Sequence, residues 1–343
     1  MNNGKCSGRF QQKSIYAMKY SMFYTLLIGT AMAGQAQKEN TMTNNNPLLC
    51  NPQTGLCELP VAPQHSEYNT NISTEKQIKI LYFTDPICSS CWGIEPQLRK
   101  LKLEYGNLLD IEYHMGGLLP DWSYNSGGIS KPSDVAHHWD EASVYYDMPI
   151  DGDVWLNDPL NSSYPASIGF KAAQMQDKQK ALLFMREMRE MVFLHKKNIA
   201  KWEVLEQAAK NVQLDVVQLK KDYEGKAQEL FKADLETTRN NGVRGFPTLI
   251  FVGNNQQKET LYGAKPYASF EMLVAKMAPK SVKNNYAKDW KHLFAHYSSL
   301  TAREFAELAE LPRNEAESLL NQLTAEKFLD KHQTKNGAIW TIR

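Results

Sequence analysis

The sequence predicts an α/β fold that carries a large helical insertion and ends in a small helical module. A strand, a helix and a second strand follow one another within about forty residues after position 78. Helical periodicity then fills most of residues 167–240, which is more helix than one crossover between two strands needs. Strand character returns at residue 248, so we expect one sheet whose chain is interrupted by the helices.

The first strand, helix and second strand each have a clear local signal. Ile78–Thr84 is an apolar run that Asp85 and a proline close, which is typical of a buried strand. From Cys91 to Tyr105 apolar residues recur at helical spacing, and Gly106 ends that helix. Leu109–Met115 alternates as a second strand. The chain therefore places its two neighbouring cysteines at a junction between a strand and a helix.

The middle of the chain is expected to be mostly helical. Residues 117–165 are rich in Gly, Pro and Asp and predict loops with one short helix. The elements predicted after them are helices over Ser167–Asn211 and Leu214–Asn240, strands over Thr248–Val252 and Glu259–Tyr262, and a closing helix over Pro266–Met277. We therefore expect a domain over residues 78–279 with a helical insertion at about 125–240.

Residues 284–343 predict a winged-helix-like module. Helices are expected over Trp290–Tyr297, Thr301–Leu311 and Arg313–Phe328, followed by a hairpin that turns at Asn336-Gly337. Eight Lys or Arg balance eight Asp or Glu in this segment, and DNA affinity depends on contacts to phosphates. The composition therefore favours a docking module for a client or protease partner and excludes nucleic acid as its ligand.

The overall charge predicts no strong attraction to nucleic acid or to an anionic membrane. Lys plus Arg number 39 and Asp plus Glu number 38. No segment after the N-terminal region approaches the roughly 20 apolar residues of a membrane helix, so we expect no membrane span in the mature protein.

The first 77 residues predict a leader and an arm. Residues 1–41 are either a signal peptide or an upstream extension, because basic residues precede an apolar run and an Ala-Met-Ala site. Translation from Met42 would give a cytoplasmic protein, whereas a genuine signal peptide over residues 1–36 would give a periplasmic or exported one. Residues 42–77 are polar and predict a flexible arm that carries Cys50 and Cys57.

Cys88 and Cys91 predict redox chemistry. A thiolate at the first turn of a helix faces free backbone N–H groups, which lower its pKa, so Cys88 is the expected nucleophile and Cys91 the thiol that resolves the mixed disulfide. The alternatives are a structural disulfide and a zinc site. Zinc would need Cys50 and Cys57 as further ligands, and their spacing is longer than usual. We therefore expect neither a metal nor another cofactor.

A second motif supports the redox prediction. The segment 242–248 (GVRGFPT) comes just before a predicted strand, and it resembles the thioredoxin superfamily, in which a cis X-Pro peptide faces the Cys-x-x-Cys pair. The resemblance implies that Pro247 is cis and that the backbone of Phe246 lines a substrate groove. Trp92 and Trp122 are expected to wall that groove.

The motif set also resembles the DsbA family, in its FrnE-like and YjbH-like (Spx adaptor) branch. The matching segments are 85–93 (DPICSSCWG), 115–119 (MGGLL), 163–167 (SYPAS) and 242–248. The resemblance implies a thioredoxin fold with an inserted helical domain, and a thiol-disulfide oxidoreductase or isomerase-like enzyme acting on protein dithiols and disulfides. The alternative is an adaptor that binds a client for proteolysis, with the thiols as a redox sensor. Ser89 and Ser90 differ from the usual residues between the cysteines and leave the direction of electron flow open.

Overall fold

The computed structural model describes residues 76–123 and 129–343 of the 343-residue chain. The predicted leader, all but the last two residues of the predicted arm, Cys50 and Cys57 lie outside these residues. Within the described part, no helix is both long and apolar enough to cross a membrane.

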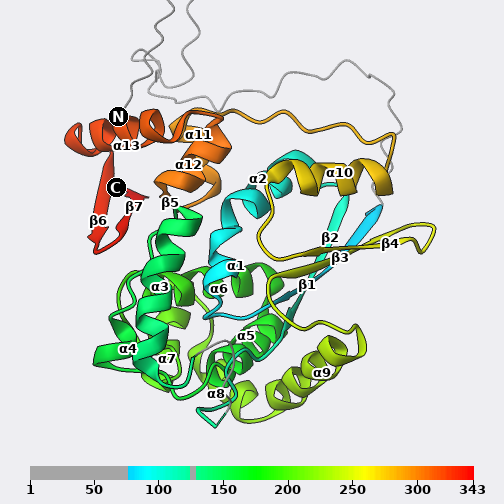
Figure 1. The fold of residues 1–343 in the computed structure, drawn as a ribbon, viewed down its shortest axis with the longest axis vertical. Coiled ribbons are helices and arrows are strands. Elements are labelled where there is room, and N and C mark those ends of the chain that lie inside the picture. Colours follow the sequence, from blue (N-terminus) through cyan, green and yellow to red (C-terminus); the bar gives the residue numbers. More distant parts are fainter. Residues whose placement is uncertain (1–75, 124–128) are drawn as a thin grey trace, which may run out of the picture. The chain divides into compact units, whose positions relative to one another are not determined.

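A four-stranded sheet in the order β2-β1-β3-β4 forms the centre of the fold (Figure 1). β1 (Ile78–Thr84) pairs in parallel with β2 (Leu109–Met115) and antiparallel with β3 (Thr248–Gly253). β4 (Lys258–Tyr262) pairs antiparallel with β3. All four predicted strands are confirmed. β1 is central and largely buried, which explains why its sequence is a nearly continuous apolar run.

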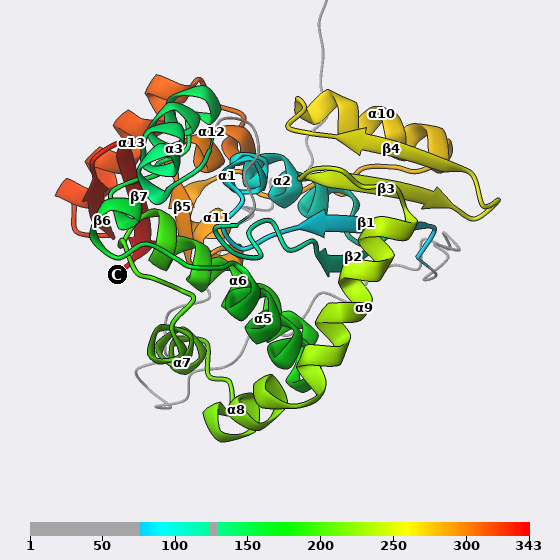
Figure 2. The same ribbon diagram turned by 60° about the horizontal axis from the view of Figure 1, so that its bottom comes forward.

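The predicted helix over Cys91–Tyr105 is two helices. α1 (Ser89–Gly93) and α2 (Glu95–Tyr105) meet at Ile94, whose backbone leaves the helical conformation. α2 lies beside α10 (Tyr267–Met277), and Figure 2 shows both helices on the same side of the sheet. The cysteines thus belong to a helix of five residues.

Among the residues that the structure describes, seven helices lie between β2 and β3. They are α3 (Pro132–Tyr146), α4 (Val154–Asn157), α5 (Tyr164–Gln176), α6 (Lys178–Phe193), α7 (Trp202–Asn211), α8 (Val216–Glu224) and α9 (Lys226–Asn240). The expectation of loops with one short helix over residues 117–165 was wrong, because α3 has 15 residues and α4 follows it. A local signal for α3 was present: it starts at Pro132, and Asp134 accepts the backbone N–H of Lys131 (3.2 Å).

The last sixty residues form a second small sheet and three helices. The elements are α11 (Trp290–His296), β5 (Ser299–Thr301), α12 (Ala302–Ala309), α13 (Arg313–Ala325), β6 (Leu329–Thr334) and β7 (Gly337–Ile342). The strands pair antiparallel in the order β5-β7-β6. The predicted helices and hairpin are present and β5 was not predicted, while the winged-helix assignment stays a prediction.

This C-terminal module (residues 284–343) has a core of its own and also packs on the rest of the described chain. Phe305, Leu320 and Trp340 are buried in that core. α12 packs against α2, the helix that follows the cysteines. The module is therefore close to the predicted redox site.

Candidate thiol site

Cys88 and Cys91 lie at the start of α1, as the sequence predicts, and both are free thiols. Cys88 is the N-cap residue, and its Sγ accepts the backbone N–H of Cys91 (3.2 Å). The backbone N–H of Cys88 donates to the carbonyl of Asp85 (3.2 Å), and this hydrogen bond fixes the turn before α1. Cys88 is 4% exposed and Cys91 is fully buried.

The expected low pKa of Cys88 was wrong for the reduced pair. Burial, and then the hydrogen bond to Cys91, raise the pKa of the Cys88 thiol well above its usual range. Burial opposes ionisation of Cys91 as well, but the hydrogen bond from Cys88 and the positive charge of Arg189 outweigh it and lower the pKa of Cys91. A five-residue helix supplies little dipole, and the two sulfurs together hold the first negative charge.

Asp85 ties the cysteine loop to two other motif segments. Its carboxylate is fully buried and accepts the backbone N–H groups of Ile87 (3.1 Å) and Leu118 (2.8 Å). The hydroxyl of Ser163 donates to the same carboxylate (2.8 Å). Leu118 and Ser163 belong to two of the motifs noted in the sequence, so Asp85 explains why those segments occur together. The sequence places Asp85 at the end of a strand and in the motif 85–93, but it gives no sign of these contacts.

The Phe246-Pro247 peptide bond is cis, as predicted. The Phe246 ring lies against Gly116, where an added Cβ would be 1.9 Å from a ring atom. A side chain at position 116 would therefore force the Phe246 ring to move. That the backbone of Phe246 meets a substrate stays a prediction.

A cavity of about 320 Å³ opens beside Cys88. Its walls are largely aromatic and aliphatic, with Trp122, Trp139, Trp155 and Phe246 contributing the aromatic surface. Cys88 forms part of the wall and Cys91 does not. The geometry thus presents the Cys88 sulfur to a bound molecule and keeps the second sulfur behind it. We call this cavity the thiol cleft.

Trp92 does not wall the thiol cleft, so that prediction was wrong. Its side chain is fully buried, its indole N–H donates to the carbonyl of Pro149 (3.1 Å), and its ring stacks on Phe193. The guanidinium of Arg186 lies 4.4 Å from the centre of the Trp92 ring. Trp92 is a core residue that joins α1 to the helical insertion, whereas Trp122 does line the cleft.

Two residues near the pair escaped sequence reasoning. The Tyr146 hydroxyl shares a hydrogen bond with the Ser90 hydroxyl (2.7 Å), so α3 closes over α1. Arg189 is almost fully buried and donates to Thr84 Oγ1 (2.8 Å) and the carbonyl of Asp85 (3.4 Å). Neither had a local signal, because each depends on a contact with a distant segment.

The described residues offer no alternative metal centre. Within residues 76–123 and 129–343, no group of three or more His, Cys, Asp or Glu side chains could hold an ion. The zinc alternative with Cys50 and Cys57 falls outside these residues.

Comparison with known proteins places the chain in a family. The family model for thioredoxin matches residues 81–272, more than half of the chain. The ClpXP adapter protein SpxH of Halalkalibacterium halodurans is 32% identical over 303 residues, which cover 87% of this chain and 98% of that protein. The SpxH of Bacillus subtilis is 28% identical over 271 residues, covering 78% of this chain and 89% of that protein.

A solved structure supports the same fold. A candidate protein disulfide isomerase from Nitrosomonas europaea superposes with a TM-score of 0.51 at 19% identity, covering 58% of this chain and 97% of that one. The chain therefore belongs to the thioredoxin family, and within it to the group of the SpxH proteins.

Proposed function

We propose that this protein is an adaptor that binds a client protein and presents it to a ClpXP protease. The observation that carries the proposal is the length of the match to SpxH, which covers 87% of this chain and so extends beyond the thioredoxin-like segment at 81–272. A protein that shared only redox chemistry would need similarity around the cysteines alone. For this function we propose a cytoplasmic location.

The thiol cleft is the surface that we propose for client binding. Its aromatic walls suit apolar side chains of a partner, and the described part of the chain places Leu118, which is 40% exposed, at its rim. An exposed apolar side chain beside a cavity is typical of a surface that a partner protein covers.

The test uses full-length protein, purified ClpX and ClpP, and a partner identified by crosslinked pulldown. We expect the adaptor to accelerate degradation of that partner about tenfold or more, and the Cys88→Ala/Cys91→Ala variant to retain most of this effect. Leu118→Glu should lose partner binding. Leu183→Glu is the matched control, because Leu183 is 55% exposed on α6 and is not among the cleft residues. Degradation that proceeds equally without the adaptor would refute the proposal.

A second candidate function is thiol-disulfide exchange with protein substrates, and the arrangement of the two cysteines favours it. Transfer of the shared proton from Cys88 to Cys91 would put the charge on the sulfur in the cleft wall, where it could attack a substrate disulfide and release one substrate thiolate. Cys91 would then give its proton to the released thiolate and attack the Cys88 sulfur, which releases the second substrate thiolate and leaves the Cys88–Cys91 disulfide.

Reduction of insulin disulfides with glutathione as the electron donor tests this second function. We expect Cys88→Ala to abolish the activity. Activity that survives in Cys88→Ala would exclude it while leaving the adaptor proposal untouched.

A further inference from the structure

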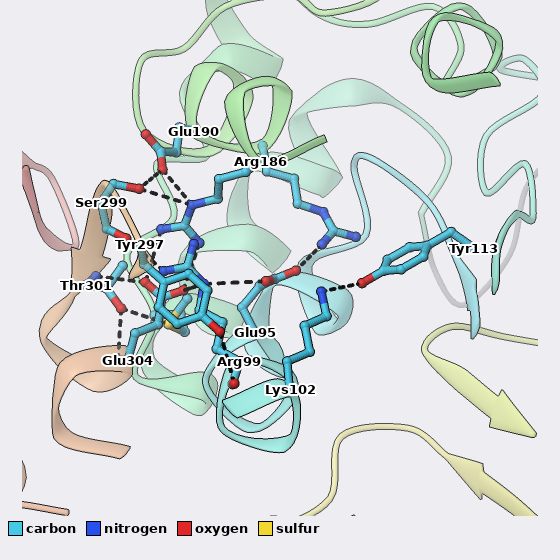
Figure 3. A network of polar contacts seen from close by, with 12 residues as sticks. Glu95, Arg99, Lys102, Tyr113, Arg186, Glu190, Tyr297, Ser299, Thr301 and Glu304 are labelled. Atoms are coloured by element: carbon cyan, nitrogen blue, oxygen red, sulfur yellow. Dashed lines mark hydrogen bonds and ion pairs between the residues drawn. The ribbon is translucent and has the colours of Figure 1, made fainter. Parts of the chain in front are cut away.

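A buried network of charges joins the cysteine-bearing segment to the C-terminal module (Figure 3). Its members are three arginines and three glutamates: Arg99 and Glu95 of α2, Arg186, Arg189 and Glu190 of α6, and Glu304 of α12. Their formal charges cancel. All six side chains are largely buried, so water screens their charges weakly. A charge that is added or removed nearby therefore changes the energies of these ion pairs.

Glu304 is the carboxylate that the C-terminal module contributes. It is fully buried and accepts two hydrogen bonds from Arg186, at Nη1 (2.8 Å) and Nη2 (3.1 Å). Arg99 Nε lies 3.3 Å from the same carboxylate. Figure 3 shows Glu304 reaching from the module toward α2 and α6. Both arginines thus share one carboxylate of the module, in addition to Glu190 beside Arg186 and Glu95 near Arg99.

Both arginines also lead back to the cysteines. Arg186 stacks on Trp92, the residue directly after Cys91. Arg99 approaches Glu95 (3.9 Å), and Glu95 forms an ion pair with Arg189. Arg189 in turn donates to Thr84 and to the carbonyl of Asp85, at the base of the cysteine loop. Each route from Glu304 to the cysteine loop is therefore a chain of direct contacts.

We propose that Glu304 is a positioning residue for the cysteine pair, through which the C-terminal module and the pair influence each other. A thiolate on the pair and the Glu304 carboxylate are like charges in one buried network. The thiolate draws on Arg189, whereas Glu304 draws on Arg99 and Arg186. Glu95 pairs with both Arg189 and Arg99, so it links the two groups of charges. Screening by salt is weak at this depth, so their repulsion is felt across the network. Ionisation of the pair should weaken the ion pairs that Glu304 forms with Arg99 and Arg186, and loss of the thiolate should strengthen them. Linkage makes the effect reciprocal.

Disulfide formation is the step that removes the thiolate. An external disulfide such as glutathione disulfide accepts two electrons from the pair: one sulfur attacks it and releases a glutathione thiolate, and the second sulfur closes the Cys88–Cys91 bond and releases another. The single thiol proton of the pair leaves with one of the two products. The inference concerns the pair itself and holds whichever partner protein binds the cleft.

The first experiment measures the pH dependence of alkylation of the pair by iodoacetamide in the full chain. In Glu304→Gln we expect the midpoint to fall by about half to one pH unit, which is about three- to tenfold faster reaction below the midpoint. The glutathione equilibrium should shift toward the reduced form. Glu304→Asp keeps the charge and should stay close to wild type.

The control variant is Glu307→Gln, on the same helix. Glu307 pairs with Arg303 (3.0 Å) and Lys100 (3.8 Å) rather than with the network arginines. Other charged or titratable groups facing the pair are unchanged in all variants: Tyr82 on β1, Glu95 on α2, Tyr146 on α3, Arg189 on α6, and His138 and Arg244 in the cleft wall. An unchanged midpoint in Glu304→Gln, or an equal shift in Glu307→Gln, would overturn the proposal.

A second measurement uses the unmodified protein and does not depend on whether Glu304→Gln folds. Hydrogen exchange of α12 is followed by mass spectrometry after reduction and after oxidation with glutathione disulfide. We expect slower exchange in α12 in the disulfide form, and no difference in Cys88→Ala/Cys91→Ala. Equal or faster exchange after oxidation of the wild-type protein would contradict the coupling.

Discussion

Asp85 shows how one buried side chain can organise a site and also cost stability at neutral pH. Its carboxylate joins the cysteine loop, the segment at Leu118 and the start of α5 through Ser163. Burial nevertheless raises the pKa of Asp85 from 3.8 to about 6, and the hydrogen bonds from Leu118, Ile87 and Ser163 offset this in part. The native state therefore binds this proton more tightly than the unfolded chain does.

The stability of the protein should consequently rise as the pH falls through about 6. The contribution of Asp85 is complete below its unfolded pKa of 3.8 and is lost as the pH rises through its folded pKa of about 6. The difference between these two pKa values corresponds to a change of about 3 kcal/mol in the free energy of unfolding. Urea titrations between pH 3.5 and 7.5 measure this change, and Asp85→Asn should flatten the pH dependence.

Asp110→Asn is the control for this measurement, because Asp110 is exposed on β2. It should keep the wild-type pH dependence. If Asp85→Asn also kept it, another group would be responsible for the slope.

The packing of α3 on α1 also depends on residues that are far apart in the sequence. α3 ends over α1, where the Tyr146 side chain packs against Gly93. A Cβ at Gly93 would lie 2.5 Å from Tyr146 Cγ and 3.0 Å from its Cβ, so the base of the tyrosine, rather than its flexible tip, is in the way. The helix α3 can close over the cysteines because residue 93 has no side chain.

Gly93→Ala should therefore destabilise the protein by about 1–3 kcal/mol, since the end of α3 must move. It should also speed alkylation of the cysteines, because the Ser90–Tyr146 hydrogen bond is disturbed. Gly169→Ala is the matched control within α5, where the nearest atom to an added Cβ is 3.4 Å away. That variant should be as stable as the wild type or slightly more stable. Equal stability losses in both variants would contradict this account of the α1–α3 contact.

Over the whole described molecule, the C-terminal module has its own apolar core but shares its buried charges with the rest of the chain. Tyr297 donates to the carbonyl of Arg99 (3.0 Å), and Arg99 donates to the carbonyl of Ser299 (2.7 Å). Separating the module would leave Glu304 without both of its arginines and Arg99 with Glu95 alone. An unpaired buried charge is costly, so partial opening at this interface is unfavourable.

We therefore expect the module and the central sheet to unfold in one cooperative step. Hydrogen exchange in increasing denaturant should show α12 and β1 losing protection at the same denaturant concentration. Loss of protection in α12 well before β1 would show that the module unfolds independently.

Much of the fold could be predicted because its signals are local. The strands Ile78–Thr84 and Leu109–Met115 have the apolar patterns of strands, and Cys88, Cys91 and Pro247 stand in recognisable motifs. α3 was missed because Gly-, Pro- and Asp-rich sequence around it predicts loops, although Pro132 and Asp134 mark its start.

The strands of the four-stranded sheet and the position of both thiols could be predicted from the sequence, since each depends on residues close together in the chain, and the family resemblance implied the cis proline. The tertiary structure alone decided which thiol faces the cleft, that Trp92 is buried, and that Glu304 reaches the arginines of α2 and α6. The pKa values of the two cysteines belong to this second group. The physical reason is that burial and charge act through space, so they depend on segments that are up to two hundred residues apart in the sequence.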